Sequence, residues 1–286
     1  MFDRRDDPEE LLDSLKRFLG LWYGALPTWY GTSEDKLAAA RLPNSLRRLY
    51  GFAGNWPGES WWGSAFANQD VLLPFEMLVM DDGKLLFAIE NQGVWRCGTE
   101  PDGDDPPVWY RLDDGPWIRF CDSLAQFLVT LCLQETVFNS QHRGLMPQVT
   151  DYLRSRNCHV APLWLDGPFV PSEGSEPRRC SFHLVDRQFL VYYDDWCGTN
   201  AVEPWKKLPE LFKPEPKKCA PMPHDETIMD ARWIPNVIKK SILLRWQREH
   251  NEQAEFHSRR AELFHRLALS LDGKLWSNDG NWNSET

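Results

Sequence analysis

Carboxylates are concentrated in one stretch of the chain, where their type and spacing could serve the binding of a basic partner. Eleven acidic side chains lie between residues 70 and 114, against three basic ones. These acids are Asp70, Glu76, Asp81, Asp82, Glu90, Glu100, Asp102, Asp104, Asp105, Asp113 and Asp114. A surface of one charge attracts an oppositely charged partner over long range and raises the association rate more than the affinity. The pattern therefore predicts an acidic face that binds a basic protein.

Each acid taken alone has a simpler explanation, because Asp tolerates the backbone of tight turns. The residues that we predict to contact the partner are Asp81, Asp82, Asp102, Asp104, Asp105, Asp113 and Asp114. The segment DGDDPP, which begins at Asp102, lacks the alternating ligands and terminal Glu of a calcium loop. A turn is favoured there over a cation site, and we expect neither a metal nor a cofactor.

A second candidate for binding is the segment GNWPGESWWG at residues 54–63, which is rich in turn-forming residues. It contains Trp56, Trp61 and Trp62. Tryptophan is common at interface hot spots because it buries a large area with few rotatable bonds. The alternative is that these rings cover the core as a lid. We include the three residues among the predicted partner contacts.

Enzymatic motifs are missing from the sequence. It has no GxSxG, GxxxxGK[ST] or HExxH motif, and no GxGxxG follows a predicted strand. The seven histidines are scattered, which is typical of solvated surface residues. A Cys–His nucleophile pair formed by His183 with Cys158 or Cys180 remains as an alternative hydrolase hypothesis. We predict that the protein is not an enzyme.

Composition narrows the class of partner. The formal net charge of −10 argues against binding to nucleic acid or to an anionic membrane. The longest apolar run, residues 127–133, is far shorter than the roughly 18–20 residues that span a bilayer. The seven cysteines form no CxxC pair, as expected for buried thiols in a reducing compartment. We expect a cytoplasmic protein.

Helix signals mark the first fifty residues. Asp7 can cap a helix that begins at Pro8, carries an apolar stripe from Leu11 to Leu19 and stops at Gly20. A second short helix is predicted after Ser33, and a third over residues 44–50. The pattern then changes to strands.

Four apolar runs, VLLPFEMLVM, KLLFAIEN, GVWRCGTE and PVWYRL, predict an antiparallel meander between residues 71 and 112. Asp82-Gly83 and Asp102-Gly103 supply the positive-φ turns that such connections need. Ser123 then opens a predicted amphipathic helix whose apolar side, beginning at Leu124, faces this sheet. The connections are too short for crossover helices, so the meander cannot be parallel.

The second half of the chain predicts a short helix at 149–157 and strands at 161–170, 180–185 and 189–196. We place an α+β domain over residues 1–215, with a core at 5–140 and a β-containing elaboration at 145–215. A Pro-rich, charged linker is predicted at 216–230, followed by a long helix and a frayed tail over 231–286.

The first half resembles the SUKH superfamily, the Smi/Knr-like proteins, over about residues 5–140. The resemblance rests on the first helix, on Leu42-Pro43 opening a helical segment with Leu46, Leu49 and Tyr50, and on the meander centred on KLLFAIENQGVWRC. The turn and strand DGDDPPVWY and the closing helix SLAQFLVTL complete it. The Trp-containing segment and residues 145–286 depart from a minimal member.

That resemblance implies an α+β fold, and many bacterial members are immunity proteins that bind and block a toxin, often a nuclease. We therefore expect a non-enzymatic immunity protein that occludes the active face of a basic toxin domain. The first alternative is a regulatory or scaffold protein with no link to a toxin. The Cys–His hydrolase is the second alternative.

Overall fold

The computed structural model describes residues 2–23, 30–54, 66–67, 69–90, 93–112, 114–145, 147–171 and 178–200, and they form an α+β fold. The predicted linker at 216–230 and the predicted helix and tail at 231–286 lie outside the described residues. So do Trp56, Trp61, Trp62 and Asp113. Among the described helices, none is both long and apolar enough to cross a membrane.

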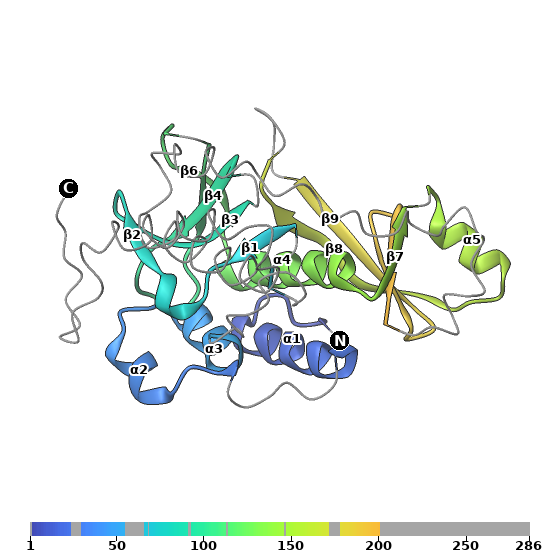
Figure 1. The fold of residues 1–286 in the computed structure, drawn as a ribbon, viewed down its shortest axis with the longest axis horizontal. Helices are drawn as coiled ribbons and strands as arrows, with labels where there is room; N and C mark the ends of the chain where they lie inside the picture. The colour runs from blue at the N-terminus through green and yellow to red at the C-terminus, as the bar shows by residue number, and fades with distance from the viewer. Residues whose placement is uncertain are drawn as a thin grey trace, which may run out of the picture.

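Three N-terminal helices form one side of the molecule (Figure 1): α1 (Pro8–Tyr23), α2 (Glu34–Ala39) and α3 (Asn44–Ala53). The predicted cap of α1 is confirmed, because the Glu10 backbone N–H donates to Asp7 Oδ1 over 3.1 Å. The predicted stop at Gly20 is wrong, since α1 continues to Tyr23. The Trp22 ring stacks on Phe18 with centroids 5.8 Å apart, and this packing outweighs the poor helix propensity of glycine.

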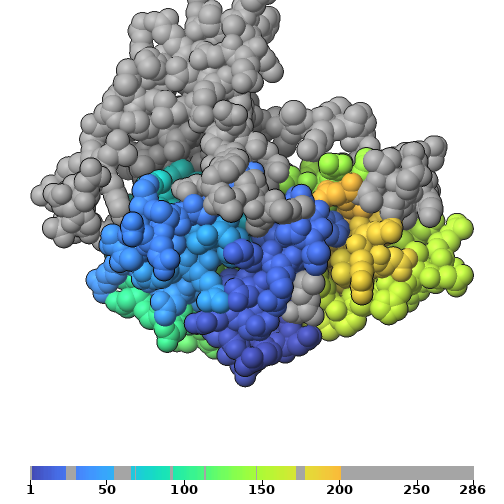
Figure 2. Space-filling model, turned by 90° about the horizontal axis from the view of Figure 1, so that it is seen from below, coloured from blue at the N-terminus to red at the C-terminus, as the bar shows by residue number. Residues whose placement is uncertain are grey.

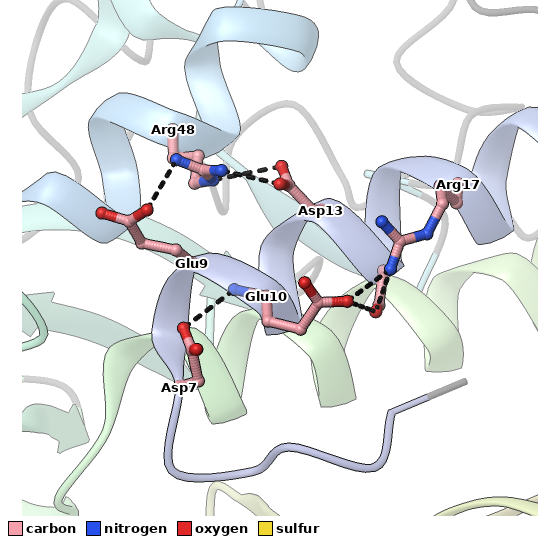
Figure 3. Close-up of polar contacts among 7 residues, drawn as sticks. Asp7, Glu9, Glu10, Asp13, Arg17 and Arg48 are labelled. Carbon is pink, nitrogen blue, oxygen red and sulfur yellow. Dashed lines mark hydrogen bonds and ion pairs between the residues drawn. The ribbon is translucent and has the colours of Figure 1, made fainter.

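Charged side chains join α1 to α3 (Figure 3). Arg48 of α3 donates to Asp13 Oδ2 over 2.7 Å and to Glu9 Oε2 over 3.3 Å, so one guanidinium holds two turns of α1. On α1 itself, Arg17 pairs with Glu10 at 2.6 Å. The Arg48 pairs are partly exposed and fix the angle between α1 and α3 more than they stabilise the fold.

The first sheet is the predicted antiparallel meander, with strand order β1-β3-β4-β5-β6 and β2 paired to the other end of β3. Its strands are β1 (Asp70–Leu72), β2 (Val79–Asp81), β3 (Lys84–Glu90), β4 (Trp95–Thr99), β5 (Val108–Leu112) and β6 (Ile118–Cys121). The predicted hairpin turn at Asp82-Gly83 is confirmed by φ values of 49° and 80°. The single predicted strand at 71–80 is wrong, because Pro74 has no N–H to donate and a 3₁₀ turn (Phe75–Met77) separates β1 from β2.

The central helix α4 (Leu124–Asn139) differs from the amphipathic helix that the sequence predicts. Thirteen of its sixteen residues are buried, so it has no solvated face. Phe127 packs against Phe87 of β3 and Phe169 of β8 (Val160–Phe169), with ring centroids 5.8 and 5.7 Å apart. Figure 1 shows α1 on one side of α4 and the first sheet on the other. The polar residues in the second half of α4 are therefore inside the protein.

A second antiparallel sheet, of order β7-β11-β10-β9-β8, follows α4. It contains β7 (His142–Leu145), β8 (Val160–Phe169), β9 (Arg178–Val185), β10 (Phe189–Tyr192) and β11 (Trp196–Thr199), with α5 (Val149–Ser155) at its outer end. The short helix and the strands at 161–170 and 180–185 are confirmed. The prediction did not include β6 or β7.

The predicted strand at 189–196 is two strands, because the chain turns at Tyr193 and Asp194 with φ values of 53° and 60°. Glycine or asparagine normally marks such a turn. Here Asp194 Oδ1 accepts the Thr150 backbone N–H over 2.7 Å, and Asp194 O accepts the Val149 N–H over 3.0 Å. The turn therefore caps α5, and this contact with a distant segment holds a backbone that the local sequence does not favour.

Both sheets contribute to one main core, which contains α1, α3, α4 and the inner halves of β8, β9 and β10. Residue Asn200, at the end of the described chain, donates to the Trp22 carbonyl of α1 over 3.0 Å. Figure 2 shows these segments side by side on one surface, with the N-terminal helices in blue and residues near 200 in orange. A smaller cluster around Val149 and Phe189 lies under α5.

Glycine at position 167 tests the contact between β8 and α4. A Cβ there would overlap Trp164 Nε1 and lie 2.5 Å from Thr130 Oγ1, the pair that forms a buried 2.9 Å hydrogen bond. We expect Gly167→Ala to lower the free energy of unfolding by about 1–3 kcal/mol through overpacking. Urea denaturation of the full chain measures it. The control is Gly20→Ala, where no atom lies within 4 Å, and we expect a gain of about 0.5–1 kcal/mol from helix propensity. Equal effects at the two sites would contradict this packing.

Candidate functional site

The structure divides the predicted acidic face into groups with different roles. Asp70 is 3% exposed and belongs to the interior. Asp81, Asp82 and Asp114 gather around two arginines at one end of the first sheet. Asp102, Asp104 and Asp105 form a turn that contacts the helices. The acids that are neighbours in sequence thus do not form one continuous surface.

We define the aspartate rim as Asp81, Asp82 and Asp114. Asp81 Oδ2 lies 2.9 Å from Arg96 Nε, and Asp81 Oδ1 lies 3.3 Å from Arg111 Nη1. The side chains of Asp82 and Asp114 are 71% and 73% exposed, whereas those of Arg96 and Arg111 are 3% and 12% exposed. Arg111 Nη2 lies 3.2 Å from Asp82 Oδ2, and Arg96 Nη2 lies 4.0 Å from Asp114 Oδ1, so each exposed carboxylate has a buried cation beside it.

The strands and turns of the first sheet position this rim. Asp82 occupies the left-handed position of the β2–β3 turn, while Arg96 and Arg111 are directly paired on β4 and β5. Trp117 lies over them and donates its indole N–H to the Asp81 carbonyl over 3.2 Å. The Arg111 guanidinium is 5.3 Å from the Trp117 ring centroid, a cation–π distance. The rim is consequently held by backbone and side-chain contacts together.

The other predicted contact residues belong to a capping turn, which we define as residues 102–105. Its Gly103 and Asp104 carbonyls accept the backbone N–H groups of Asn44 and Ser45, over 2.9 and 3.0 Å, at the start of α3. Asp105 Oδ1 accepts the Ala125 N–H of α4 over 2.7 Å. These bonds satisfy donors that helix N-termini leave unpaired.

Asp105 therefore has a structural role in addition to any binding role. Its Oδ1 also accepts the Ser45 hydroxyl over 2.7 Å, and its Oδ2 accepts the Ser123 hydroxyl over 2.5 Å. Asp104 accepts from Asn44 Nδ2 over 2.5 Å. Asp102 is 63% exposed and pairs with Arg41 at 2.5 Å. Of the three aspartates, Asp102 is the one whose carboxylate is exposed and does not bond a helix end.

Internal ion pairs reduce the charge that the acidic stretch presents. Glu76 pairs with Lys36 at 2.6 Å, and Glu100 pairs with Lys84 at 2.9 Å. All three basic residues within 70–114 are paired to acids of the same stretch. Counting acids along the sequence thus overestimates the field, because it does not include cations brought in from α2 and from residue 41.

Sequence reasoning missed a polar network in the interior. Gln134 of α4 donates to Asp70 Oδ2 over 2.6 Å and accepts from the Tyr192 hydroxyl over 2.8 Å. Glu135, which has no exposed surface, accepts the backbone N–H groups of Gln69 and Asp70. Nothing in the sequence QETVF distinguishes a buried glutamate from a solvated one. The only signal is that Gln134 and Glu135 follow the run at residues 127–133, in which Thr130 is the one polar residue.

Cysteine chemistry is disfavoured by the geometry. Cys180 and His183 lie three residues apart on β9, so their side chains point to opposite faces of the sheet. Burial raises the pKa of the Cys180 thiol, and it also raises the pKa of the Cys121 thiol to about 11. Burial, followed by the charge of Arg154, lowers the pKa of His183. Among the described residues, no three His, Cys, Asp or Glu side chains are grouped to hold a metal ion.

The cysteines give a prediction about reactivity. Cys97, Cys121, Cys132, Cys180 and Cys197 are buried, whereas Cys158 is half-buried. A thiolate is the reactive form, so thiols with raised pKa values should stay unlabelled at pH 7.5 in the native protein. Mass spectrometry after brief treatment with a thiol-reactive probe should find label on Cys158 before any of these five. Selective labelling of Cys180 would instead support the form of the hydrolase alternative that uses Cys180; the form that uses Cys158 is not separated by this experiment.

Removing the carboxylate of the capping turn tests its structural role. We expect Asp105→Ala to lower the free energy of unfolding by about 1–3 kcal/mol, because it removes a helix cap and leaves the partly buried Ser123 hydroxyl without its acceptor. Asp102→Ala is the matched control, with an expected loss below about 1 kcal/mol for an exposed ion pair. Both are measured by urea denaturation of the full chain. Equal losses would mean that Asp105 does not cap α4.

Comparison of this chain with family models, with curated proteins and with solved structures finds no match. The resemblance to the SUKH superfamily therefore stays a prediction from the quoted residues. Function has to be argued from the geometry of the site itself.

Proposed function

We propose that this protein is a non-enzymatic binding module whose aspartate rim contacts a basic surface on another protein. The observation that carries the proposal is the contrast in exposure between the outer carboxylates, at 71% and 73%, and the arginines that fix them, at 3% and 12%. A carboxylate that is already paired with a buried cation, as Asp82 is with Arg111 at 3.2 Å, loses less conformational freedom on binding than an unpaired one, so less of the interaction energy is spent on ordering it.

The electrostatics of the rim favour a cationic partner. Three aspartates share two arginines, which leaves a net negative group whose free carboxylate oxygens face solvent. Asp102, at 63% exposure in the turn between β4 and β5, adds a further accessible carboxylate, although it is paired with Arg41. Exposed charges of this kind act mainly on the rate of encounter, and salt screens their effect.

We further propose that the partner is a bacterial toxin domain with a basic active face, and that the protein acts as its immunity protein by occluding that face. The support is the resemblance of residues 5–140 to the SUKH superfamily together with the acidic rim. A nuclease is a suitable toxin class, because it presents a basic face to its substrate. A regulatory or scaffold protein is the second candidate, since the same rim would suit any basic partner.

Removing the two exposed charges tests the proposal. The probes are the products of the adjacent reading frames, co-expressed one at a time with this protein. We expect one product to inhibit growth and the wild-type chain to restore it. Asp82→Asn/Asp114→Asn should then slow association with that product by about tenfold at low salt and flatten its salt dependence. Asparagine also accepts the left-handed backbone of position 82, so the turn is kept.

The matched control is Asp122→Asn/Asp151→Asn, which removes two aspartates of 86% and 69% exposure, each paired with an arginine, away from the rim. It should associate at the wild-type rate. If both double variants slowed association equally, the effect would come from the net charge of the whole protein and not from the rim. Stable association without toxicity would favour the scaffold, and a rate unchanged in the rim variant would overturn its role in binding.

A further inference from the structure

A chain of buried hydrogen bonds links the two sheets through α4. Asp70 at the edge of the first sheet accepts from Gln134 Nε2 over 2.6 Å, and Gln134 Oε1 accepts from Tyr192 of the second sheet over 2.8 Å. The Tyr192 hydroxyl lies 3.6 Å from Cys180 Sγ. Asp70, Gln134 and Tyr192 are between 3% and 4% exposed. One amide side chain therefore bridges β1 and β10.

A second carboxylate lies beside Asp70. Glu135 receives backbone N–H bonds from Gln69 at 2.8 Å and from Asp70 at 2.9 Å, one on each carboxylate oxygen. Two such donors stabilise the ionised form of Glu135. Two buried carboxylates this close cannot both be ionised without a large cost, and the proton then belongs to the one with fewer donors. That residue is Asp70.

We propose that Asp70 carries a proton in the native protein and acts as a proton-dependent latch, whose ionisation loosens β1 from α4 and hence the first sheet from the second. The proposal concerns the fold and is independent of the rim and of its partner.

Charged and titratable groups around Asp70 come from every neighbouring element. They are Glu135 of α4, Glu90 of β3, Cys97 of β4, Arg178 and Cys180 of β9, Tyr192 of β10 and, next to Glu135, Arg143 of β7. Burial raises the pKa of Asp70 well above its usual range, and the charges of Glu135 and Glu90 raise it further. The Gln134 hydrogen bond and Arg178 oppose this shift.

The sign of the pH dependence follows from proton counting. Above the ordinary pKa of aspartate, about 4, the unfolded chain has released this proton while the native state still holds it. Stability linked to Asp70 is therefore complete at low pH and is lost as the pH rises towards the pKa of the folded state. Each pH unit in that window raises the unfolding equilibrium constant by up to tenfold.

The test compares the pH dependence of urea unfolding between pH 5 and 8 for the full wild-type chain and Asp70→Asn. In wild type the unfolding equilibrium constant should rise by up to tenfold per pH unit, and Asp70→Asn should lack this rise. Asp102→Asn, at an exposed position, is the control and should follow the wild-type curve. Glu135→Gln removes the neighbouring charge and should move the wild-type decline to lower pH. Identical pH slopes for wild type and Asp70→Asn would overturn the proposal.

A spectroscopic measurement can overturn the proposal even if Asp70→Asn does not fold. Infrared spectroscopy of the wild-type chain at pH 7 should detect the carbonyl band of a protonated carboxylic acid, which an ionised carboxylate lacks. The latch also predicts that amides of β1 lose hydrogen-exchange protection at higher pH before amides of β5 do, after correction for intrinsic rates. Absence of the protonated band at pH 7 would overturn the proposal, and so would a loss of protection that is uniform over the sheet.

Discussion

The burial of α4 on all its sides is the constraint on which the rest of the structure depends. A helix with no solvated face must obtain partners for all its polar groups from the protein, because an unpaired buried donor or acceptor costs about 1–3 kcal/mol. Asp105 caps its first turn, Trp164 bonds Thr130 in its middle, and Gln134 and Glu135 bond β1 near its end. Each of these contacts also fixes a neighbouring element, so the polar groups of α4 determine where both sheets lie.

Local signals predicted much of the fold and little of the site. The cap at Asp7, the hairpin at Asp82-Gly83 and the meander follow from neighbours in sequence, and the structure confirms them. The turn at Tyr193 and the buried Glu135 depend on segments that are far away along the chain, which no local pattern records. For the same reason the acids could be recognised as a group while their division into rim, capping turn and interior could not.

This division changes how the acidic stretch is understood. The carboxylates of residues 70–114 perform three physical tasks. Some pair with cations from other elements and set the geometry between those elements. Those at helix ends satisfy backbone donors, and those of the rim retain exposed charge. A binding surface is thus smaller and more ordered than the sequence count implies. It is tied to the first sheet by Arg96, which pairs with Asp81, and by Arg111, which pairs with Asp81 and Asp82 and lies over the Trp117 ring.

Native-state hydrogen exchange tests most directly whether α4 unites the two sheets into one cooperative unit. Amides of β4 in the first sheet and of β10 in the second would be followed in the full chain at increasing urea. Since both sheets share the core around α4, the account predicts that the slowest amides of both strands exchange with one opening free energy, equal to that of global unfolding. Exchange of β10 through a separate and smaller opening, while α4 and β4 stay protected, would contradict it.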